Sequence, residues 1–223
     1  MTENVIRAHT IDGAWRDAMS LCVRSGYDYV VEGGSYVGQI RKQMEEIMIV
    51  IENPGLRPLA PILPPGIPGP TNDEKIEAYF QRYIFSDERA PNEVYTYGGF
   101  ITKQYRRIVE LLVDSKGNTN QSTIAIGNVE TTFLGDPPCL RSISFKVVNG
   151  RLNMTVYFRS WDLFAGLPEN LGGLQLLKEM VLSDLQAAIP VEDGKIIAFS
   201  DGLHLYEQYF DLVNCLNVEK IEK

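Results

Sequence analysis

The pair Asn149-Gly150 constrains the fold most, because it predicts a tight β-hairpin in the second half of the chain. An Asn-Gly pair suits a type I′ turn, in which both central residues take positive φ angles. Apolar and polar side chains alternate before the pair, and residues 151–157 after it are again rich in β-forming types. The apolar positions before the turn are Ile143, Phe145 and Val147. We therefore expect two antiparallel strands joined at this pair.

The register of this hairpin predicts which residues meet at its open end. If the residues flanking the turn pair with each other, Cys139 lies opposite Ser160. In the same register Leu140 lies opposite Arg159. The regular pleat then places the side chain of Arg159 on the face away from Cys139. A β-bulge would bring the two side chains together, and bulges are common beside active sites.

Cys139 follows two prolines and is a candidate nucleophile. A free thiol titrates near ~8.5, so little of it is thiolate at neutral pH. A nearby guanidinium, here that of Arg159, favours the thiolate and lowers the pKa of the thiol. The alternative is that Cys139 is a small buried apolar residue, as most free cysteines are. The hairpin alone leaves both interpretations open.

Length and composition predict a single domain spanning residues 1–223. The chain has 223 residues, of which 44% are hydrophobic, and this is enough for one core. A net charge of −8 argues against an extended nucleic acid as partner, because proteins that bind one usually carry a basic face. The three cysteines lack C-x-x-C spacing, so we expect neither a disulfide framework nor a metal site.

The sequence shows no targeting or membrane-spanning pattern. Residues Met1–Asn4 lack a basic stretch followed by an apolar one. The longest aliphatic run, Ile47–Ile51, is too short to span a bilayer. We therefore expect a cytoplasmic protein with no membrane partner.

Hydrophobic periodicity predicts an α/β (α+β) domain with a large mixed β-sheet flanked by helices. Asp12 caps a first helix that ends at Gly26 and has Cys22 on its core face. Cys215 lies in a last helix, where we expect it to pack in the core. The other predicted elements are helices starting at 73 and at 101–112, 171–188 and 207–216, and strands at 47–51, 123–126 and 195–199. The proline-rich segment 54–70 is predicted as a loop, either a lid or a plain connector.

Five segments of the chain, in order and at matching spacing, resemble thymidylate synthase, especially the short archaeal type. They are Asp136–Cys139, Asn149-Gly150, Tyr157–Asp162, Leu163–Asn170 and Asp201–Tyr206. The resemblance implies the thymidylate synthase fold. It also implies a homodimer whose subunits meet back to back through their sheets.

The resemblance implies that the Cys139 thiolate adds to C6 of dUMP. C5 then attacks the methylene carbon of a reduced pterin, which also supplies the hydride that completes dTMP. Glu77 and Tyr97 would move protons in this reaction, and Arg159 would be a catalytic residue that also binds the phosphate with Ser160. The alternative for Glu77 is a solvated glutamate on a helix.

The resemblance assigns four further residues to substrate binding. Asn170 would read the pyrimidine, because a carboxamide can donate to O4 and accept from N3–H. Asp162 would orient the base and the pterin. His204 and Tyr206, two apart in an extended segment, share a face and would bind the 3′-hydroxyl of the deoxyribose. The alternatives are a helix N-cap for Asn170 and isolated polar residues at a strand end for the other two.

The sequence departs from the family pattern in ways that affect the phosphate and the pterin. Leu140 stands where the family usually has histidine, and Asn120 and Gln121 stand where it has a paired arginine that reaches the partner subunit's phosphate. The candidates to replace that pair are Arg41, Arg106 and Arg107. Few residues follow Tyr206, so we expect the family's long C-terminal segment to be absent. The carbon donor is therefore either 5,10-methylene-tetrahydrofolate or a methylene-tetrahydromethanopterin-type pterin.

Two other functions compete with dUMP methylation. One is a nucleotide hydroxymethylase, in which water replaces the hydride, and the other is a silent homologue that binds a nucleotide or RNA. Asn170 argues against a cytosine-specific hydroxymethylase, where an aspartate would fit better. Cys139 together with Arg159 argues against a silent binder. The sequence therefore predicts a thymidylate synthase-type methyltransferase that prefers dUMP to dCMP.

Overall fold

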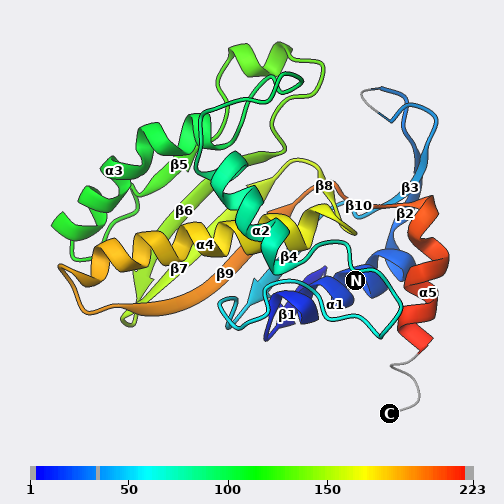
Figure 1. Ribbon diagram of the computed structural model, residues 1–223, viewed down its shortest axis with the longest axis horizontal. Helices are drawn as coiled ribbons and strands as arrows, with labels where there is room; N and C mark the ends of the chain where they lie inside the picture. Colours follow the sequence, from blue (N-terminus) through cyan, green and yellow to red (C-terminus); the bar gives the residue numbers. More distant parts are fainter. Residues whose placement is uncertain (1–3, 34–35, 219–223) are drawn as a thin grey trace.

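The computed structural model describes residues 4–33 and 36–218 and is built on a six-stranded mixed β-sheet (Figure 1). The two ends of the predicted domain, residues 1–3 and 219–223, lie outside the described residues. In spatial order the strands are β1 (Val5–Ala8), β4 (Ile47–Ile51), β9 (Glu192–Ser200), β7 (Arg151–Phe158), β6 (Leu140–Val148) and β5 (Thr123–Ala125). The pairs β1–β4 and β7–β9 are parallel, and the other pairs are antiparallel. The large mixed sheet expected from the sequence is confirmed.

Helix α4 (Gly166–Gln186) crosses the middle of this sheet (Figure 1). Its apolar side chains Leu171, Leu174, Leu177, Val181 and Leu185 are fully buried. The other helical segments are α1 (Ile11–Ser25), α2 (Asp73–Tyr79), the π-helical turn η1 (Phe80–Ile84), α3 (Gly98–Asp114), η2 (Glu130–Phe133), η3 (Glu207–Tyr209) and α5 (Phe210–Val218). No helix in the described part of the chain is long and apolar enough to cross a membrane.

A second, four-stranded sheet was not expected from the sequence. It has the order β2 (Tyr27–Val30), β3 (Ile40–Gln43), β10 (Leu203–Tyr206) and β8 (Trp161–Asp162). In this sheet Arg41 pairs with Tyr206, and His204 pairs with Asp162. The small sheet therefore brings together predicted site residues that are far apart in the sequence.

The hairpin at Asn149-Gly150 forms as predicted, with φ angles of 51° and 74° at the two turn residues. The predicted register holds from the turn back to the pair Ser142–Tyr157. It then shifts by one residue, so that Leu140 pairs with Phe158 rather than Arg159. The predicted opposition of Cys139 and Ser160 is therefore wrong. The shift in register is a β-bulge, the feature that we expected to be needed to bring the side chains of Cys139 and Arg159 together.

Several local predictions need correction. Thr10, not Asp12, caps helix α1, because its side chain accepts the Gly13 N–H. Helix α4 begins five residues earlier than predicted, at Gly166, so Asn170 lies inside the helix and is not its N-cap. Cys22 is fully buried as predicted, but Cys215 is exposed on α5 and does not pack in the core. Residues 54–70 form no helix or strand, as expected.

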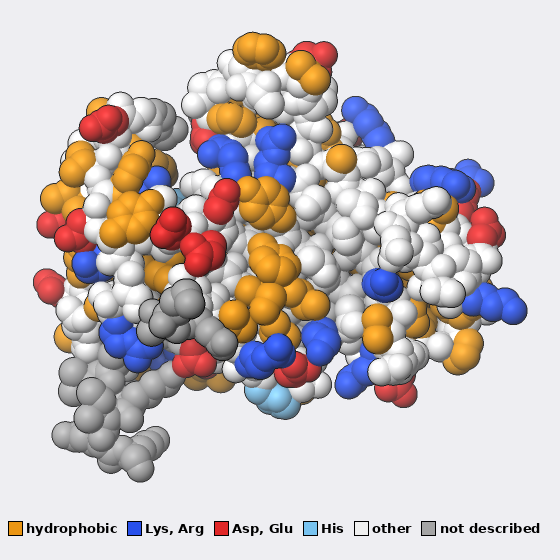
Figure 2. Space-filling view, turned by 180° about the vertical axis from the view of Figure 1, so that it is seen from behind, with side chains coloured by type: hydrophobic (Ala, Val, Ile, Leu, Met, Phe, Trp, Pro, Cys, Tyr) orange, Lys and Arg blue, Asp and Glu red, His pale blue; other side chains and the backbone are white. Residues whose placement is uncertain are grey.

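The face of the large sheet away from the helices is only partly covered. Along β7 and β9, side chains alternate between fully buried and partly exposed, because the helices cover only one side. The apolar residues on the open side include Val5, Met48, Tyr157 and Phe199, which line a shallow depression. Figure 2 shows hydrophobic side chains gathered near the middle of the molecule seen from behind, with lysines and arginines at their border.

Candidate active site

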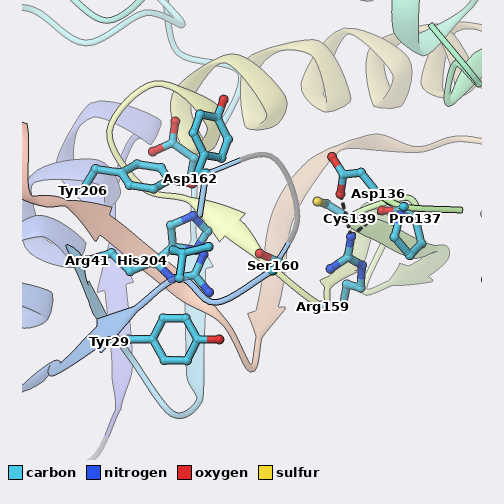
Figure 3. A pocket seen from close by; sticks show the side chains of 14 residues that line it. Tyr29, Arg41, Asp136, Pro137, Cys139, Arg159, Ser160, Asp162, His204 and Tyr206 are labelled. Atoms are coloured by element: carbon cyan, nitrogen blue, oxygen red, sulfur yellow. Dashed lines mark hydrogen bonds and ion pairs between the residues drawn. The ribbon is translucent and has the colours of Figure 1, made fainter. Parts of the chain in front are cut away.

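A cavity of about 350 Å³ lies where the open end of the β6–β7 hairpin meets the small sheet. It contains most of the residues predicted for the site: Arg41, Cys139, Arg159, Ser160, Asp162, His204 and Tyr206. Figure 3 shows them in two groups, with Cys139 and Arg159 on one side and Arg41, His204 and Tyr206 on the other. Ser160 lies between the two groups (Figure 3).

The bulge places the Arg159 side chain against the segment that carries the thiol. The backbone N–H of Arg159 donates to the carbonyl of Cys139 at 2.9 Å. Its guanidinium donates to the carbonyl of Pro138 and to the carboxylate of Asp136, both at 3.2 Å, and also to the carbonyl of Pro137. Arg159 thus fixes residues 136–138, which we call the thiol loop, around Cys139.

The charge environment of Cys139 differs from the expectation. Burial raises the pKa of the half-buried Cys139 thiol, the Arg159 guanidinium lowers it, and the carboxylate of Asp136 raises it. The net result is a raised pKa, so the predicted lowering by the arginine is outweighed by burial. Arg159 remains the group that favours the thiolate.

Tyr97 lies behind the thiol, at the N-terminal end of α3. Its buried hydroxyl accepts the backbone N–H of Leu140 at 3.3 Å. Burial and the neighbouring Cys139 raise the pKa of Tyr97 well above its usual range. Its ring contacts those of Tyr83 and Tyr95, so the predicted residue stands in an aromatic cluster beside the thiol.

Arg41 is the cation on the other side of the cavity. Its guanidinium lies 4.6 Å from the ring centre of Tyr29, which favours a cation–π contact. Its Nε is buried and has no hydrogen-bond partner among the described residues. A buried donor without a partner is costly unless a ligand satisfies it. The other two candidate arginines, Arg106 and Arg107, instead pair with Glu110 on α3.

His204 is neutral at physiological pH. Burial, with the charge of Arg41, lowers its pKa to about 4, although the bond to Gly202 opposes this shift. Its Nδ1 lies 2.8 Å from the carbonyl oxygen of Gly202, which can only accept, so Nδ1 carries the proton. Nε2 is then an acceptor, which suits a sugar hydroxyl. Tyr206 adjoins it edge to face, with ring centres 5.1 Å apart.

Asp162 links the cavity to helix α4. Its carboxylate accepts the backbone N–H groups of Phe164 at 3.1 Å and of Gly166 at 3.3 Å. Burial raises the pKa of Asp162, and these backbone bonds oppose the rise. The side chain therefore fixes the start of α4 while it lines the cavity.

Three predicted site residues do not line this cavity. Glu77 is exposed on α2, so the structure does not bring its carboxylate to the thiol. The carboxamide of Asn170 lies just beyond the start of α4 and bonds to Trp161 and Tyr79. Tyr97, as described above, approaches Cys139 from outside the cavity wall.

A second cavity, of about 710 Å³, lies beyond the tyrosine cluster and was not predicted. Tyr79 and Tyr83 are among its lining residues, and the ring of Tyr83 contacts that of Tyr97. The charged lining residues of this cavity are three cations and three carboxylates: Lys75, Arg82, Arg89, Glu88, Glu93 and Glu169. Among the described residues, no group of three or more His, Cys, Asp or Glu side chains is placed to hold a metal ion. The run of aromatic and basic residues at 75–89 was the sequence signal for this cavity.

The arrangement predicts how Arg159 controls the thiol. In a Cys215→Ser background only Cys139 should react with iodoacetamide, because Cys22 is fully buried. Since the guanidinium favours the thiolate, Arg159→Ala should move the pH midpoint of alkylation upward. Arg159→Lys keeps the positive charge and should move it less. Equal midpoints in all three proteins would show that Arg159 does not act on the thiol.

Comparisons with known proteins identify the family of the chain. The family profile for thymidylate synthase matches residues 96–221. A Methanosarcina acetivorans protein named "Putative thymidylate synthase" is 31% identical over 217 residues, which cover 94% of this chain and 92% of that protein. A protein of the same name from Methanosarcina barkeri is 29% identical over 217 residues, with the same coverage.

A solved structure shows the same fold. Thermostable thymidylate synthase A from Bacillus subtilis matches with a TM-score of 0.68 and 16% identity, over 92% of this chain and 83% of that one. The thymidylate synthase fold implied by the sequence is therefore confirmed. On the family profile and the archaeal relatives, the chain belongs to the thymidylate synthase family.

Proposed function

We propose that this protein methylates dUMP to dTMP with a methylene-reduced pterin as co-substrate. The observation that carries the proposal is the cavity itself. It joins a single thiol, Cys139, to an arginine, a neutral histidine and a tyrosine that suit a nucleotide. Family membership supports the same reaction class.

The two groups of side chains suit the two ends of dUMP. Arg41 has a buried donor without a described partner, so we assign the phosphate to Arg41 and Ser160. His204 Nε2 and the Tyr206 hydroxyl would bind the 3′-hydroxyl of the sugar. Nε and Nη2 of Arg159 are engaged with the thiol loop, so a phosphate would have to replace Asp136 in order to bind at Nη2.

The thiol is placed to start the reaction. The Cys139 thiolate would add to C6 of the uracil, with Arg159 favouring the charged sulfur. The new electron density at C5 makes that carbon the nucleophile, and the C5 proton must later leave. Elimination finally returns the electron pair to the sulfur and frees C6. When bound, the pterin supplies the one-carbon unit and the hydride.

Tyr97 is the group best placed to handle the C5 proton. Its hydroxyl accepts from Leu140 N–H beside Cys139. Because its raised pKa keeps this hydroxyl protonated, it would receive the C5 proton only while passing its own proton on to water. Glu77 would need to move from its exposed position to take part. We therefore assign the proton transfer to Tyr97 and not to Glu77.

The second cavity fits a reduced pterin. Its lining residues Tyr79 and Tyr83 offer stacking surfaces, and its three cationic side chains, set among three carboxylates, could each pair with an anionic group of a tail. Tetrahydrofolate and tetrahydromethanopterin both carry such tails, so both remain candidate donors. Glu169, whose pKa is raised by burial, is one of three carboxyl groups that line this cavity, with Glu88 and Glu93.

We also propose a cytoplasmic homodimer. The partly covered face of the large sheet carries Val5, Met48 and Phe199, and a second subunit would remove them from water. The face also carries polar side chains, among them Thr123 and Ser144, whose hydroxyls are 2.8 Å apart. The interface between the two subunits would therefore contain both apolar and polar side chains.

Cys139 should be the only essential cysteine. With [5-³H]dUMP and each methylene-pterin in turn, the wild type should release tritium, and Cys139→Ala should not, because no adduct at C6 can form. Cys215→Ser is the matched control and should keep its activity, since that thiol is exposed on α5. Tritium release by Cys139→Ala would exclude the covalent mechanism. Release with a hydroxymethylated product would favour the hydroxymethylase, and the absence of release in wild type would favour a silent binder.

Arg41 should matter for binding rather than for chemistry. Arg41→Met removes the unpaired donor and should raise the KM for dUMP at least tenfold, since a hydrogen bond to a charged group is worth roughly 1.5–3 kcal/mol. The kcat should change much less. Arg106→Met, at a well-exposed arginine on α3, is the control and should leave KM unchanged. An unchanged KM in Arg41→Met would remove this residue from the phosphate site.

A further inference from the structure

The carboxamide of Asn170 is held from two sides by hydrogen bonds. The indole Nε1–H of Trp161 donates to its Oδ1 at 2.9 Å. Its Nδ2 donates to the hydroxyl of Tyr79 at 2.8 Å. Trp161 is buried and stacks flat on Phe158, with ring centres 4.2 Å apart and planes 4° from parallel, so the indole cannot easily move away.

The two partners of the carboxamide differ in what they can fix. An indole N–H is a donor only, so Trp161 can face the amide oxygen but not the amide nitrogen. If the amide flipped, two donors would face each other and a buried N–H would be left unpaired. The hydroxyl of Tyr79 both donates and accepts, and it could pair with either end of the amide. Trp161 alone therefore fixes the orientation of Asn170.

This orientation matters because an asparagine is not specific by itself. One lone pair on Oδ1 and one N–H on Nδ2 remain after the bonds to Trp161 and Tyr79. Uracil offers an acceptor at O4 and a donor at N3, whereas cytosine offers a donor at N4 and an acceptor at N3. An amide that could flip would satisfy either base by exchanging its two ends. An amide with a fixed orientation satisfies only one.

Asn170 is near enough to the cavity for this to affect a base. It lies one helical turn beyond Gly166, whose N–H bonds to the cavity residue Asp162. If Gly166 carried a Cβ, that atom would lie 3.2 Å from the Asp162 Cβ and 3.7 Å from the Asn170 Oδ1. The side chains of Asp162 and Asn170 therefore both lie beside Gly166.

We propose that Trp161 is a specificity-determining positioning residue, which fixes the flip of the Asn170 amide and so makes the site select uracil over cytosine. The inference rests on the proposed function, in which Asn170 reads the base. Trp161 would act on the base only through Asn170, because its indole bonds to Asn170 and does not line the cavity.

The test compares two variants by tritium release from [5-³H]dUMP and [5-³H]dCMP. Trp161→Phe keeps an aromatic ring on Phe158 but removes the N–H, so the ratio of kcat/KM for dUMP to that for dCMP should fall at least about tenfold. Tyr79→Phe is the matched control, because it also removes one hydrogen bond from the same amide. It should lower turnover but keep the preference for dUMP. Equal falls in the two variants, or an unchanged ratio in Trp161→Phe, would overturn the proposal.

A second measurement does not depend on turnover or on the stability of Trp161→Phe. The chain has two tryptophans, so ¹H–¹⁵N spectra show two indole signals. The indole of Trp15 donates to the carbonyl of Phe164 at 3.0 Å. Asn170→Ala should shift the Trp161 signal and speed its hydrogen exchange, and it should leave that of Trp15 nearly unchanged. An unaffected Trp161 signal would show that the indole does not hold the amide.

These outcomes separate the inference from the function on which it rests. If the wild type releases no tritium from either nucleotide, the proposed reaction fails. If the wild type prefers dUMP and Trp161→Phe keeps that preference in full, the reaction stands and the role of Trp161 fails. If Trp161→Phe gains activity on dCMP, both are supported.

Discussion

The site depends on a one-residue shift of register between β6 and β7. Up to Ser142 the two strands pair as the tight turn dictates, and beyond it Leu140 pairs with Phe158. Without this shift the pleat would direct the Arg159 side chain away from the thiol. With it, Arg159 bonds to both the carbonyl of Cys139 and the thiol loop. The thiol and the positive charge beside it are therefore fixed by the backbone of one hairpin.

The rest of the site is attached to this hairpin through short, rigid connections. Strand β8 follows β7 directly and joins the small sheet, in which β10 and β3 present His204 and Arg41. Asp162, on β8, accepts the N–H of Phe164, just before α4, and that of Gly166, the first residue of α4, and so fixes the helix that carries Asn170. Strand, turn and helix thus position the thiol, the groups proposed to bind the sugar and the amide proposed to read the base relative to one another. Such a fixed arrangement suits a reaction in which a thiol must attack one particular carbon of a pyrimidine.

The sequence predicted what depends on local chemistry. The turn needed positive φ at two adjacent residues, and Asn149-Gly150 supplied them. The buried strand at 47–51 and the core position of Cys22 followed from apolar patterns. The family resemblance, in turn, pointed to Cys139, Arg159, Ser160, Asp162, His204 and Tyr206, which all line the cavity.

The sequence failed where long-range contacts decide the outcome. The small sheet was missed because β2 is exposed throughout and β8 has two residues, so neither shows an apolar pattern. The direction of the pKa shift of Cys139 depends on burial, which no spacing reveals. Asn170 was taken for a possible N-cap because the preceding Gly-Leu-Pro suggests a turn, but Asp162 starts the helix earlier. Glu77 occupied a plausible place on a helix, but the face that this helix buries is the one that carries Ile76.

The central claim is that Cys139 forms a covalent bond to C6 of a uracil nucleotide, and trapping the adduct tests it most directly. In 5-fluoro-dUMP the C5 hydrogen is replaced by fluorine, which cannot leave as a cation, so the reaction should stop with the nucleotide still bound to sulfur. Incubation with a methylene-pterin, followed by mass spectrometry of the intact protein and of its peptides, gives the mass and the site. The account predicts a mass increase equal to nucleotide plus methylene-pterin, carried by the peptide that contains Cys139. An adduct on another residue, or an unmodified protein that still converts dUMP, would contradict it.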